Sequence, residues 1–509
     1  MMFVATPQEM READEAACAQ TGETVLMRNA GVAIARYIRD RTENGRIVAF
    51  TGPGNNGGDA FAAFAELEPR YERIIYAAET STESEARVKA RERATASGVR
   101  IEPLPQRLDE ARAACDGAAL ALDALFGTGA RLPLDAKYTA AVTALDAHNI
   151  PVVAIDIPSG VDALSGAIPQ RAVRATATIT LGALKPGLLL EPARQCAGEI
   201  WLADIGIQNE ILQRYATTYA SLDDAAFLAM LPTRPEQTDK RGAGAPLVIA
   251  GSEQFPGAAV LCALAAARAG AGYVTVATPA VAAPAIRAHL IEEVVVTFSS
   301  GSPKDAARDL LDVAKRNSSV AIGPGLNLDE WTGSMLRHFL EGLELPFVAD
   351  ASAFFHLAKR LDVLRSKRCV LTPHESEFAR LSGKGTIAPG ERVDRLREFV
   401  ERTGITTLLK GRATIVYDGC VMDINTTGTQ ALATAGTGDV LTGMIATLLA
   451  QGLSPFDAAR AAAHWHGLAG RFCESKRRVG VVAGDLPDAL GYALPTRCSQ
   501  PALRCVVRF

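Results

Sequence analysis

The chain has 509 residues, more than one hydrophobic core ordinarily holds, so we expect two domains. Hydrophobic residues make up 48% of it and charged residues 22%, and its 44 glycines are typical of a soluble α/β protein whose elements pack closely. A net charge of -4 excludes a strongly basic chain and gives no reason to expect nucleic acid as a partner.

The nine cysteines are scattered and form neither a C-x-x-C pair nor a His/Cys metal-ligand pattern, which is typical of free thiols in a reducing compartment. Residues 1–16 lack the apolar segment of a signal peptide. The most apolar long stretch, residues 257–285, is interrupted by Arg268 and consists largely of Ala and Gly. We therefore expect a cytoplasmic protein without a membrane span.

The first half alternates apolar runs with amphipathic segments. Thr6-Pro7-Gln8-Glu9 combines an N-cap residue, a proline at the first helical position and a capping-box glutamate, so a helix should begin there and end near Gly22. A second helix should follow, to about Arg41. Predicted strands then alternate with helices, which indicates a doubly wound, mainly parallel sheet in a domain over residues 1–220. These strands are residues 46–50, 73–79, 119–125, 151–156 and 175–181.

Prolines, charges and glycines in residues 231–245 break the alternation, and we interpret residues 221–245 as a linker region. A second alternation of strands and helices predicts another α/β domain over residues 246–490. Its apolar runs are PLVIAG, GYVTVAT, SVAIGPG, PFVAD, RCVLTPH, TTLLKG and ATIVYD, followed by the helix-like GTGDVLTGMIATLLAQG. Residues 491–509 carry no periodicity and are interpreted as a tail.

The segment TGPGNNGGDAF, residues 51–61, places a glycine-rich turn between a predicted strand and a helix. It fits G-x-G-x-x-G, whose amides usually bind phosphate, and Glu79 could bind a ribose, so a dehydrogenase is one interpretation and a structural turn another. Asp59 argues against a cofactor pyrophosphate, which its carboxylate would repel. Asparagine and carboxylate oxygens instead suit sugar hydroxyls or a hard cation.

Further polar residues follow other predicted strands. Asp123 ends one apolar run, and Asp156 and Ser159 follow another. Because the carboxyl ends of parallel strands line one crevice, these groups could converge, although each alone could be a helix cap or turn former.

In the second half, residues 435–444, AGTGDVLTGM, open an apolar helix. Its first amides could stabilise a transferring phosphoryl group while Asp439 takes a proton from a hydroxyl, or Asp439 could simply complement the helix dipole. No P-loop motif is present. Lys410 could bind a nucleotide or belong to a charged turn, and His374 could bind a ligand or be a solvated group. His464 and His466 are interpreted as packing residues.

The segments MREADEAA, LMRNAG, GPGNNGGD, DALFGTG, DIPSGVD and ALKPGLLL, in this order, resemble the NAD(P)H-hydrate epimerase domain over about residues 1–215. The resemblance implies a Rossmann-like fold that interconverts the C6 epimers of hydrated NADH and NADPH, with Asp156 as the acid/base group. It implies a potassium ion held by Asn56, Asp123 and Ser159. It implies substrate contacts from Asn55, Asn56, Gly57, Gly58, Asp59, Gly127, Thr128, Gly129, Ala130, Arg131, Leu132, Pro133, Tyr138 and Asp156. Ala60 departs from the glycine that is usual in the family.

The segments GSEQFPGAA, RAGAGYVTVAT, IGPGL, LTPHESEFARL, LKGRAT and AGTGDVLTG resemble the ADP- or ATP-dependent NAD(P)H-hydrate dehydratase, a ribokinase-like α/β fold, from about Asp239 to Leu490. The resemblance implies hydrate contacts from Ala258, Gly325, His374 and Asp439. It implies nucleotide contacts from Lys410, Gly411, Arg412, Ala413, Thr414 and Gly438. Asn327 and Glu375-Ser376 depart from the usual glycine and Pro-Gly.

Together the two halves predict a fused repair enzyme that epimerises both hydrates and dehydrates the S epimer with ADP or ATP, accompanied by magnesium. Asp439 would deprotonate the C6 hydroxyl in that reaction. Three alternatives stay open: a ribokinase-like small-molecule kinase with an N-terminal nucleotide-binding module, a dehydrogenase, and a nucleotide-sensing or RNA-associated scaffold. The sequence leaves the oligomeric state open, a homo-oligomer included.

Overall fold

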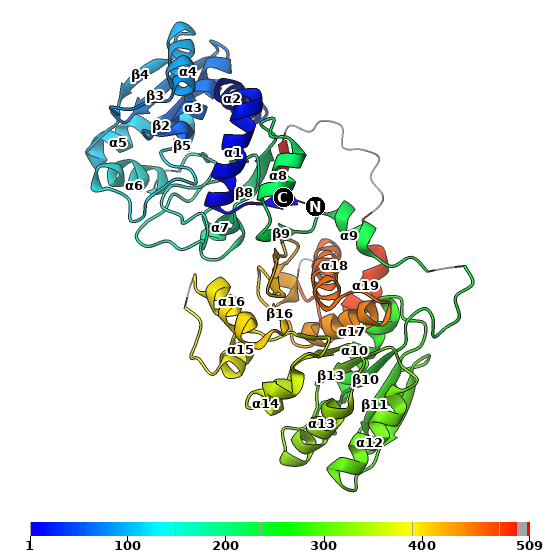
Figure 1. The fold of residues 1–509 in the computed structure, drawn as a ribbon. Coiled ribbons are helices and arrows are strands. Elements are labelled where there is room, and N and C mark those ends of the chain that lie inside the picture. Colours follow the sequence, from blue (N-terminus) through cyan, green and yellow to red (C-terminus); the bar gives the residue numbers. More distant parts are fainter. Residues whose placement is uncertain are drawn as a thin grey trace. The chain divides into compact units, whose positions relative to one another are not determined.

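A computed structural model describes residues 2–147, 149–234, 236–388, 390–477, 479–495 and 506–508. The chain divides into two compact units (Figure 1). The N-terminal unit holds residues 2–220 and the strand at 506–508, and the C-terminal unit holds residues 221–495.

The sheet of the N-terminal unit has the order β19-β8-β7-β6-β5-β2-β3-β4, and its strands are parallel except β19, which runs antiparallel to β8. The chain moves outward from β2 to β4 and returns to β5 beside β2. This reversal is a topological switch point, where a crevice forms outside the carboxyl ends of the strands. The strands are β2 (Gly45–Thr51), β3 (Tyr71–Ala77), β4 (Arg100–Pro103), β5 (Ala118–Ala124), β6 (Val152–Ile155), β7 (Ala177–Leu181), β8 (Glu199–Ala203) and β19 (Val506–Arg508); β1 (Met2–Val4) precedes them.

Helices cover both faces of this sheet. One core lies under α1 to α4 and a second under α5 and α6 (Figure 1). The predicted start of the first helix is confirmed, because Thr6 caps α1 in a capping box with Glu9 and Gly22 follows its last residue. The helices are α1 (Pro7–Thr21), α2 (Glu23–Arg39), α3 (Asn55–Glu66), α4 (Glu85–Ala96), α5 (Leu108–Cys115), α6 (Thr139–Ala147), α7 (Pro186–Leu189) and α8 (Asn209–Tyr215).

Within the C-terminal unit the strands follow the order β18-β17-β16-β15-β14-β13-β10-β11-β12. They are parallel from β12 to β16, whereas β17 and β18 are antiparallel to their neighbours. The strands are β10 (Pro246–Ile249), β11 (Thr275–Pro279), β12 (Val294–Phe298), β13 (Ser319–Ile322), β14 (Phe347–Ala349), β15 (Cys369–Leu371), β16 (Thr406–Leu409), β17 (Ile415–Tyr417) and β18 (Met422–Ile424).

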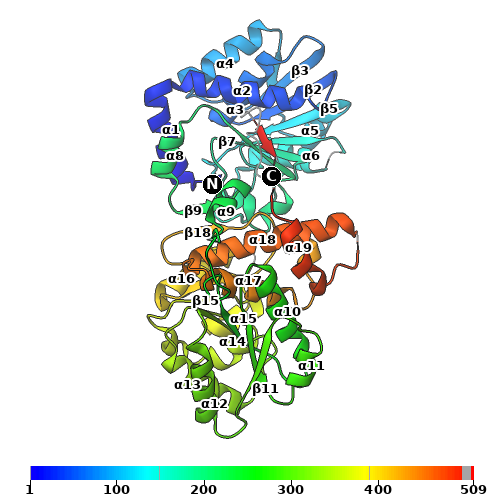
Figure 2. The same cartoon turned by 90° about the vertical axis from the view of Figure 1, so that its right-hand side faces the viewer.

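Four helices of this unit, α10, α17, α18 and α19, pack together over a large apolar core (Figure 2). Alanines and glycines let these helices approach closely, as the composition predicts. The helices are α10 (Pro256–Arg268), α11 (Ala283–Arg287), α12 (Pro303–Ala314), α13 (Glu330–Gly342), α14 (Ser352–Leu357), α15 (Glu375–Ser382), α16 (Arg392–Thr403), α17 (Thr437–Ala450), α18 (Pro455–Lys476) and α19 (Leu486–Tyr492). The predicted α/β class is confirmed for both units.

The range interpreted as a linker, residues 221–245, begins with ordered elements. Strand β9 (Tyr219–Ser221) runs into it, and helix α9 (Asp224–Met230) is capped by the side chain of Asp223. Phe227 of α9 is fully buried in the C-terminal core. The predicted tail also contains structure, since α19 reaches Tyr492 and β19 pairs with β8, whereas residues 496–505 and 509 lie outside the described part.

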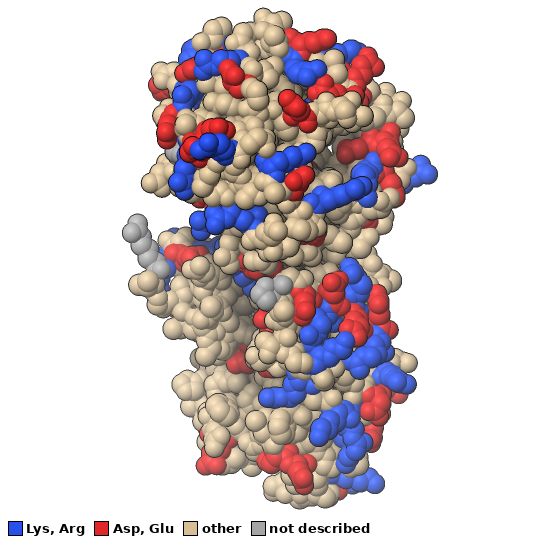
Figure 3. All heavy atoms as spheres, turned by 90° about the vertical axis from the view of Figure 1, so that its left-hand side faces the viewer, with Lys and Arg blue, Asp and Glu red and all other residues tan. Residues whose placement is uncertain are grey.

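All cysteines in the described residues are unpaired, as predicted. None of the described helices is long and apolar enough to cross a membrane. On the face drawn in Figure 3, acidic and basic side chains are interspersed rather than gathered into a continuous basic surface.

Candidate active sites

A cavity of about 610 Å³ opens in the N-terminal unit at the switch point between β2 and β5. The loops after these strands form one wall, and the α1 residues Met10, Asp14 and Cys18, spaced by one helical turn, form another. Of the residues predicted to bind the hydrate, those that line this cavity are Asn55, Asn56, Asp59, Gly127, Thr128, Gly129, Ala130 and Asp156.

The two asparagines at the start of α3 have different surroundings. The Asn55 amide donates to Glu23 Oε1 at 2.7 Å and accepts from Ser84 Oγ at 3.0 Å. The amide nitrogen and oxygen of Asn56 are buried and have no hydrogen-bond partner among the described residues. Because an unpaired buried amide costs free energy, Asn56 is suited to a ligand that supplies the missing partner.

The glycines that follow these asparagines serve packing. A methyl group on Gly57 would collide with the Arg87 guanidinium of α4, and one on Gly58 would lie 2.6 Å from Met27 Cε of α2. The cavity wall formed by the described residues includes neither glycine, so their predicted substrate contacts are not brought together with the others. Ala60 is fully buried, and its extra methyl group packs into the core between the helices.

Asp123 is the second-last residue of β5, and its carboxylate connects the segment after β5 with the loop after β6. Its carboxylate accepts from the Ser159 amide at 2.7 Å, from Ser159 Oγ at 2.6 Å and from the Leu125 amide at 3.3 Å. Burial raises the pKa of Asp123 to about 6, although the hydrogen bonds from Ser159 and Leu125 oppose the rise. The unpartnered Asn56 oxygen, the Asp123 carboxylate and the Ser159 hydroxyl are all hard oxygen donors, so this donor set fits a potassium ion.

Asp156 has the left-handed backbone conformation, with φ 68°, which is uncommon for a residue other than glycine. Its carboxylate accepts from the Thr128 amide at 3.2 Å and from the Lys185 ammonium. Lys185 is 1% exposed, and its ammonium also donates to the Leu181 carbonyl at 2.8 Å. A methyl group on Gly127 would lie 2.9 Å from Asp156 Oδ2 and 3.4 Å from Asn56 Oδ1, so both side chains face the same loop.

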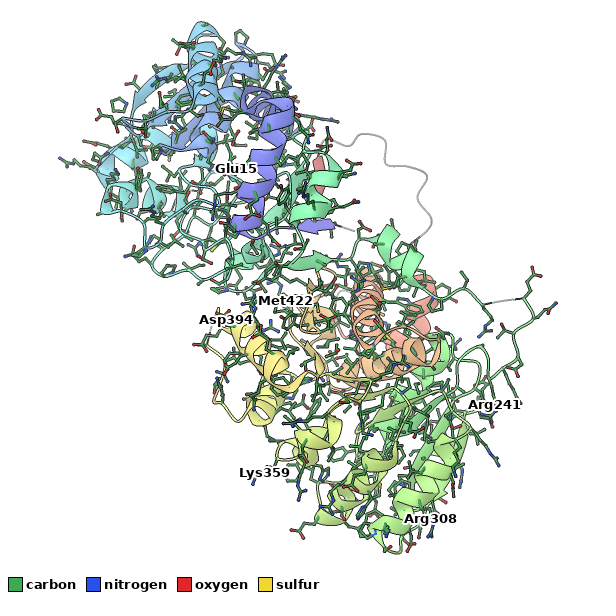
Figure 4. The ribbon with its side chains drawn as sticks, in the orientation of Figure 1. Glu15, Arg241, Arg308, Lys359, Asp394 and Met422 are labelled. Atoms are coloured by element: carbon green, nitrogen blue, oxygen red, sulfur yellow. The ribbon has the colours of Figure 1, made fainter. Side chains whose placement is uncertain are left out.

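Two further carboxyl groups, Asp14 and Asp59, line the cavity with Asp156. Burial, together with the nearby Asp156 charge, raises the pKa of Asp14 to about 6, and Lys185 opposes the rise. Burial, and then the charges of Asp156 and Asp14, raises the pKa of Asp59 well above its ordinary value. The cavity therefore places Asp59, whose carboxyl binds a proton more readily than usual, near Asp156, which is paired with Lys185. Glu15, the neighbour of Asp14, is exposed (Figure 4).

The remaining predicted epimerase residues lie outside the cavity wall. Arg131 and Pro133 are exposed, and Leu132 is partly buried between them. Tyr138 is buried and packs edge-on against Phe126, with ring centroids 4.7 Å apart, so it supports a residue that lines the cavity. Lys185 and Asp14 were missed as site residues, although ALKPGLLL and MREADEAA, which carry the family resemblance, contain them.

A second pocket, of about 370 Å³, lies in the C-terminal unit between the loop after β16, the loop after β18 and the start of α17. The predicted nucleotide residues Lys410, Gly411, Arg412, Thr414 and Gly438 line it, as does the predicted hydrate residue His374. Ala413 is buried beneath this wall. Ala258 and Gly325 adjoin each other elsewhere: a methyl group on Gly325 would lie 2.9 Å from Ala258 Cβ.

Lys410 is the centre of a buried charge cluster. Its ammonium lies 2.7 Å from Asp350 Oδ1 and 3.8 Å from Glu377 Oε2, and Thr442 Oγ1 donates to Asp350 Oδ2 at 2.8 Å. Burial lowers the pKa of Lys410, but the Asp350 and Glu377 carboxylates outweigh it and raise the pKa above the ordinary value. Asp350 and Glu377 were missed; each lies at the end of a predicted strand or within a motif, in PFVAD and HESEF.

Asp439 lies in the first turn of α17, beside this cluster. The helix is preceded by Gly436 with φ 91°, and among the described residues no side chain caps its first amides. A methyl group on Gly438 would lie 3.3 Å from Lys410 Nζ, so the ammonium faces this helix start. Burial, followed by the charge of Asp350, raises the pKa of Asp439 to about 7, and Lys410 opposes the rise. A helix start without a side-chain cap, an ammonium and a carboxyl group whose pKa lies near neutrality suit phosphoryl transfer from a nucleotide to a hydroxyl.

Of the departures from the family pattern, Glu375 makes a contact through its side chain, whereas Asn327 contacts its neighbour through the backbone carbonyl that a glycine would also have. Glu375 Oε1 lies 3.2 Å from Arg392 Nε, and Arg392 in turn donates to the Lys410 carbonyl at 3.0 Å. The Asn327 carbonyl lies 2.9 Å from His356 Nε2. His374 caps α15 in a capping box with Glu377.

Comparisons with known proteins cover both halves of the chain. Residues 246–491 match the NAD(P)H-hydrate dehydratase family, and residues 23–187 match a family described as YjeF-related protein N-terminus. The bifunctional NAD(P)H-hydrate repair enzyme of Moorella thermoacetica is 35% identical over 97% of each chain, and that of Mycobacterium tuberculosis is 37% identical over 88% of this chain and 89% of its own. A solved structure of the ADP/ATP-dependent NAD(P)H-hydrate dehydratase from Bacillus subtilis, co-crystallised with ATP and Mg²⁺, is 29% identical, with a TM-score of 0.46, and covers 54% of this chain and 97% of that chain.

Proposed function

Because this chain belongs to the family of bifunctional NAD(P)H-hydrate repair enzymes, we propose that its two units catalyse the two steps of one repair. The N-terminal unit epimerises the R and S hydrates of NADH and NADPH, and the C-terminal unit dehydrates the S hydrate at the expense of ADP or ATP. The observation that carries the proposal is that each unit has a cavity and, next to it, a largely buried carboxyl group whose pKa is raised. Asp59 lines the N-terminal cavity, and Asp439 lies in the first turn of α17, whose residues Thr437 and Gly438 line the C-terminal pocket.

In the epimerase cavity Asp156 is the acid/base group. The lone pair of the ring nitrogen expels the C6 hydroxyl, which leaves as water after taking a proton from Asp59, and C6 becomes part of an iminium ion. Water then adds to the other face while Asp156 takes its proton, and proton exchange between the two carboxyl groups restores the starting state. The ion pair with Lys185 orients the Asp156 carboxylate for this role.

The potassium ion of the epimerase cavity would be held by Asn56, Asp123 and Ser159. When bound, the ion supplies a positive charge that balances the buried Asp123 carboxylate and attracts polar groups of the hydrate. Asn55, Thr128 and the 127–130 backbone position the rest of the substrate.

In the dehydratase pocket Asp439 takes the proton of the C6 hydroxyl as that oxygen attacks the terminal phosphorus of the nucleotide. The bond from that phosphorus to the nucleotide's bridging oxygen breaks, and the first amides of α17, with Lys410, stabilise the transferring group. The new C6 phosphate leaves as the ring nitrogen donates electrons, and loss of a proton from C5 restores the double bond. The products are NAD(P)H, inorganic phosphate and the shortened nucleotide.

Magnesium accompanies the nucleotide in this proposal. The described residues contain no group of three His, Cys, Asp or Glu side chains suited to a metal, so nucleotide oxygens and water would supply most of the ligands of this ion. When bound, the ion neutralises charge on the phosphates.

Phosphate release tests this function. Purified protein, the S hydrate of NADH and ADP should yield one inorganic phosphate and one AMP for each NADH that forms. A stable phosphorylated product without NADH would indicate a small-molecule kinase instead. A cytoplasmic location and a homo-oligomer are also part of the proposal; cell fractionation and light scattering after gel filtration test them.

A further inference from the structure

His466, on α18, lines the nucleotide pocket of the C-terminal unit. It is 7% exposed, and its Nε2 has no hydrogen-bond partner within the described part of the chain. An unsatisfied buried ring nitrogen in a pocket wall is costly unless a ligand meets it. The interpretation of His466 as a packing residue is therefore incomplete.

The neighbours of His466 on α18 face other parts of the protein. His464 Nε2 lies 3.1 Å from Asp224 Oδ1, and its ring packs against Phe227 at 5.0 Å between centroids. Trp465 Nε1 donates to the Leu490 carbonyl at 2.9 Å. Of these three residues, the pocket wall includes His466 alone.

The ring of His466 is neutral at physiological pH. Burial lowers its pKa to about 4, while a hydrogen bond to the Thr437 backbone opposes this effect. A hydrogen bond that raises the pKa of an imidazole is one that its N–H donates, so the proton lies on the nitrogen that faces Thr437. Nε2 is then left with a lone pair and can only accept a hydrogen bond.

The pocket around His466 is held rigidly. Asn425 Nδ2 donates to the Ala463 carbonyl at 3.1 Å, and Thr427 Oγ1 donates to the His464 carbonyl at 2.9 Å, so the loop after β18 is fastened to α18. A methyl group on Gly467 would collide with Thr427, and only glycine permits this close approach. An acceptor on a fixed wall can discriminate between ligands.

The pocket that His466 lines has apolar residues, such as Ala463, Leu432 and Leu441, and the charged residue Lys410, whose charge helps burial to lower the pKa of His466. Lys410 and the start of α17 suit the phosphates. Phosphate oxygens accept hydrogen bonds, so an acceptor such as Nε2 suits the N–H and O–H groups of the nucleoside instead.

We propose that Nε2 of His466 accepts a hydrogen bond from the nucleoside of the phosphoryl donor and makes the pocket selective for it. The proposal rests on the nucleotide-dependent dehydratase function given above. The group that donates this hydrogen bond is an N–H or O–H group of the nucleoside, either the exocyclic amino group of adenine or a ribose hydroxyl. A base that presents a carbonyl oxygen in place of the amino group would face the lone pair with another acceptor.

The test compares His466→Phe, which removes the acceptor and keeps a ring, with His466→Gln, which keeps an acceptor on a side chain of similar reach. His464→Gln is the matched control, because His464 is equally buried on the same helix but faces away from the pocket. We expect His466→Phe to raise the KM for ADP about 3- to 10-fold, the range for one hydrogen bond, with kcat within about twofold of wild type. His466→Gln and His464→Gln should each keep the KM for ADP and kcat within about twofold of wild type.

Nucleotide analogues identify the nucleoside group that donates the hydrogen bond to His466. If the amino group is the donor, wild type prefers ADP over IDP and His466→Phe loses this preference. If a hydroxyl is the donor, wild type prefers ADP over the 2′-deoxy or 3′-deoxy analogue and the variant loses that preference. A merely structural role would leave these ratios unchanged.

The proposal is overturned if His466→Phe keeps the wild-type KM and every analogue preference, or if His464→Gln weakens ADP binding as much. Should His466→Phe not fold, wild type decides the question, since equal affinity for ADP and all three analogues contradicts the proposal. Calorimetric titration of ADP without hydrate separates this outcome from failure of the dehydratase function. If no NADH forms but His466→Phe loses affinity for ADP while His464→Gln keeps it, the function is refuted and the role of His466 is not.

Discussion

Replacement of Asp439 by asparagine should abolish dehydration while making the protein more stable. Asp439→Asn keeps the shape of the side chain but removes its ability to take the C6 hydroxyl proton. Loss of a general base costs about 10² to 10⁴ in rate, so kcat should fall by that factor with little change in the KM for ADP.

The stability effect follows from the pKa of Asp439, which burial, followed by the charge of Asp350, raises from 3.8 to about 7. The native carboxyl keeps its proton up to about pH 7, whereas the unfolded chain loses it near pH 4. The free energy of unfolding therefore falls as pH rises across this window, by up to about 4 kcal/mol, and stays low above pH 7. Asparagine cannot ionise, so Asp439→Asn should exceed wild type by up to this amount at pH 8 and match it near pH 4.

The assay combines NADH formation from the S hydrate with urea unfolding at pH 4 and pH 8. Wild-type kcat/KM should fall tenfold for each pH unit below 7, because the protonated carboxyl cannot act as a base. Asp305→Asn, at an exposed aspartate in the first turn of α12, is the matched control and should change neither rate nor the sign of the pH effect. Near-normal kcat in a folded Asp439→Asn protein would refute the base assignment, and lower stability than wild type at pH 8 would refute the burial argument.

Further predictions concern the N-terminal unit. Asp156→Asn should reduce equilibration of the two hydrate epimers, followed by chromatography, to the uncatalysed rate; unchanged equilibration would contradict its role. Lys185→Met should lower the free energy of unfolding by about 3 to 5 kcal/mol in denaturant titrations, because it leaves the Asp156 carboxylate buried without its cation, and a loss below about 1 kcal/mol would count against this pair. Asp14→Asn should be more stable than wild type at pH 8, by up to about 3 kcal/mol, and equally stable near pH 4, since burial raises the pKa of Asp14 to about 6. Glu15→Gln, on the exposed side of α1, should not change the stability at either pH. Potassium chloride should raise the Tm of wild type above its value in tetramethylammonium chloride, and Asn56→Ala should lose this difference; an equal rise in both proteins would exclude Asn56 as a ligand.

Local sequence signals predicted much of the fold because their physical causes are local. The capping box at Thr6 and Glu9 fixes the start of α1, and the alternation of apolar runs with amphipathic segments gives both parallel sheets. Asn56 and Asp439 could be located because each follows a strand or opens a helix in a distinctive motif.

Other site features depend on contacts between distant residues. Lys185 meets Asp156 across 29 positions, and Lys410 meets Asp350 across 60, so neither ion pair leaves a pattern in a short window. The packing role of Gly57 and Gly58 depends on α4 and α2, which no motif around these glycines reveals. The role proposed for His466 likewise depends on a pocket wall assembled from three loops.

The most direct measurement of the central claim is recovery of NADH from a mixture of both hydrate epimers by wild type, Asp156→Asn and Asp439→Asn, each with and without ADP. The account predicts complete recovery by wild type only with ADP, recovery of the S epimer alone at early times by Asp156→Asn, and none by Asp439→Asn. Complete recovery without a nucleotide, or rapid recovery of both epimers by Asp156→Asn, would contradict it.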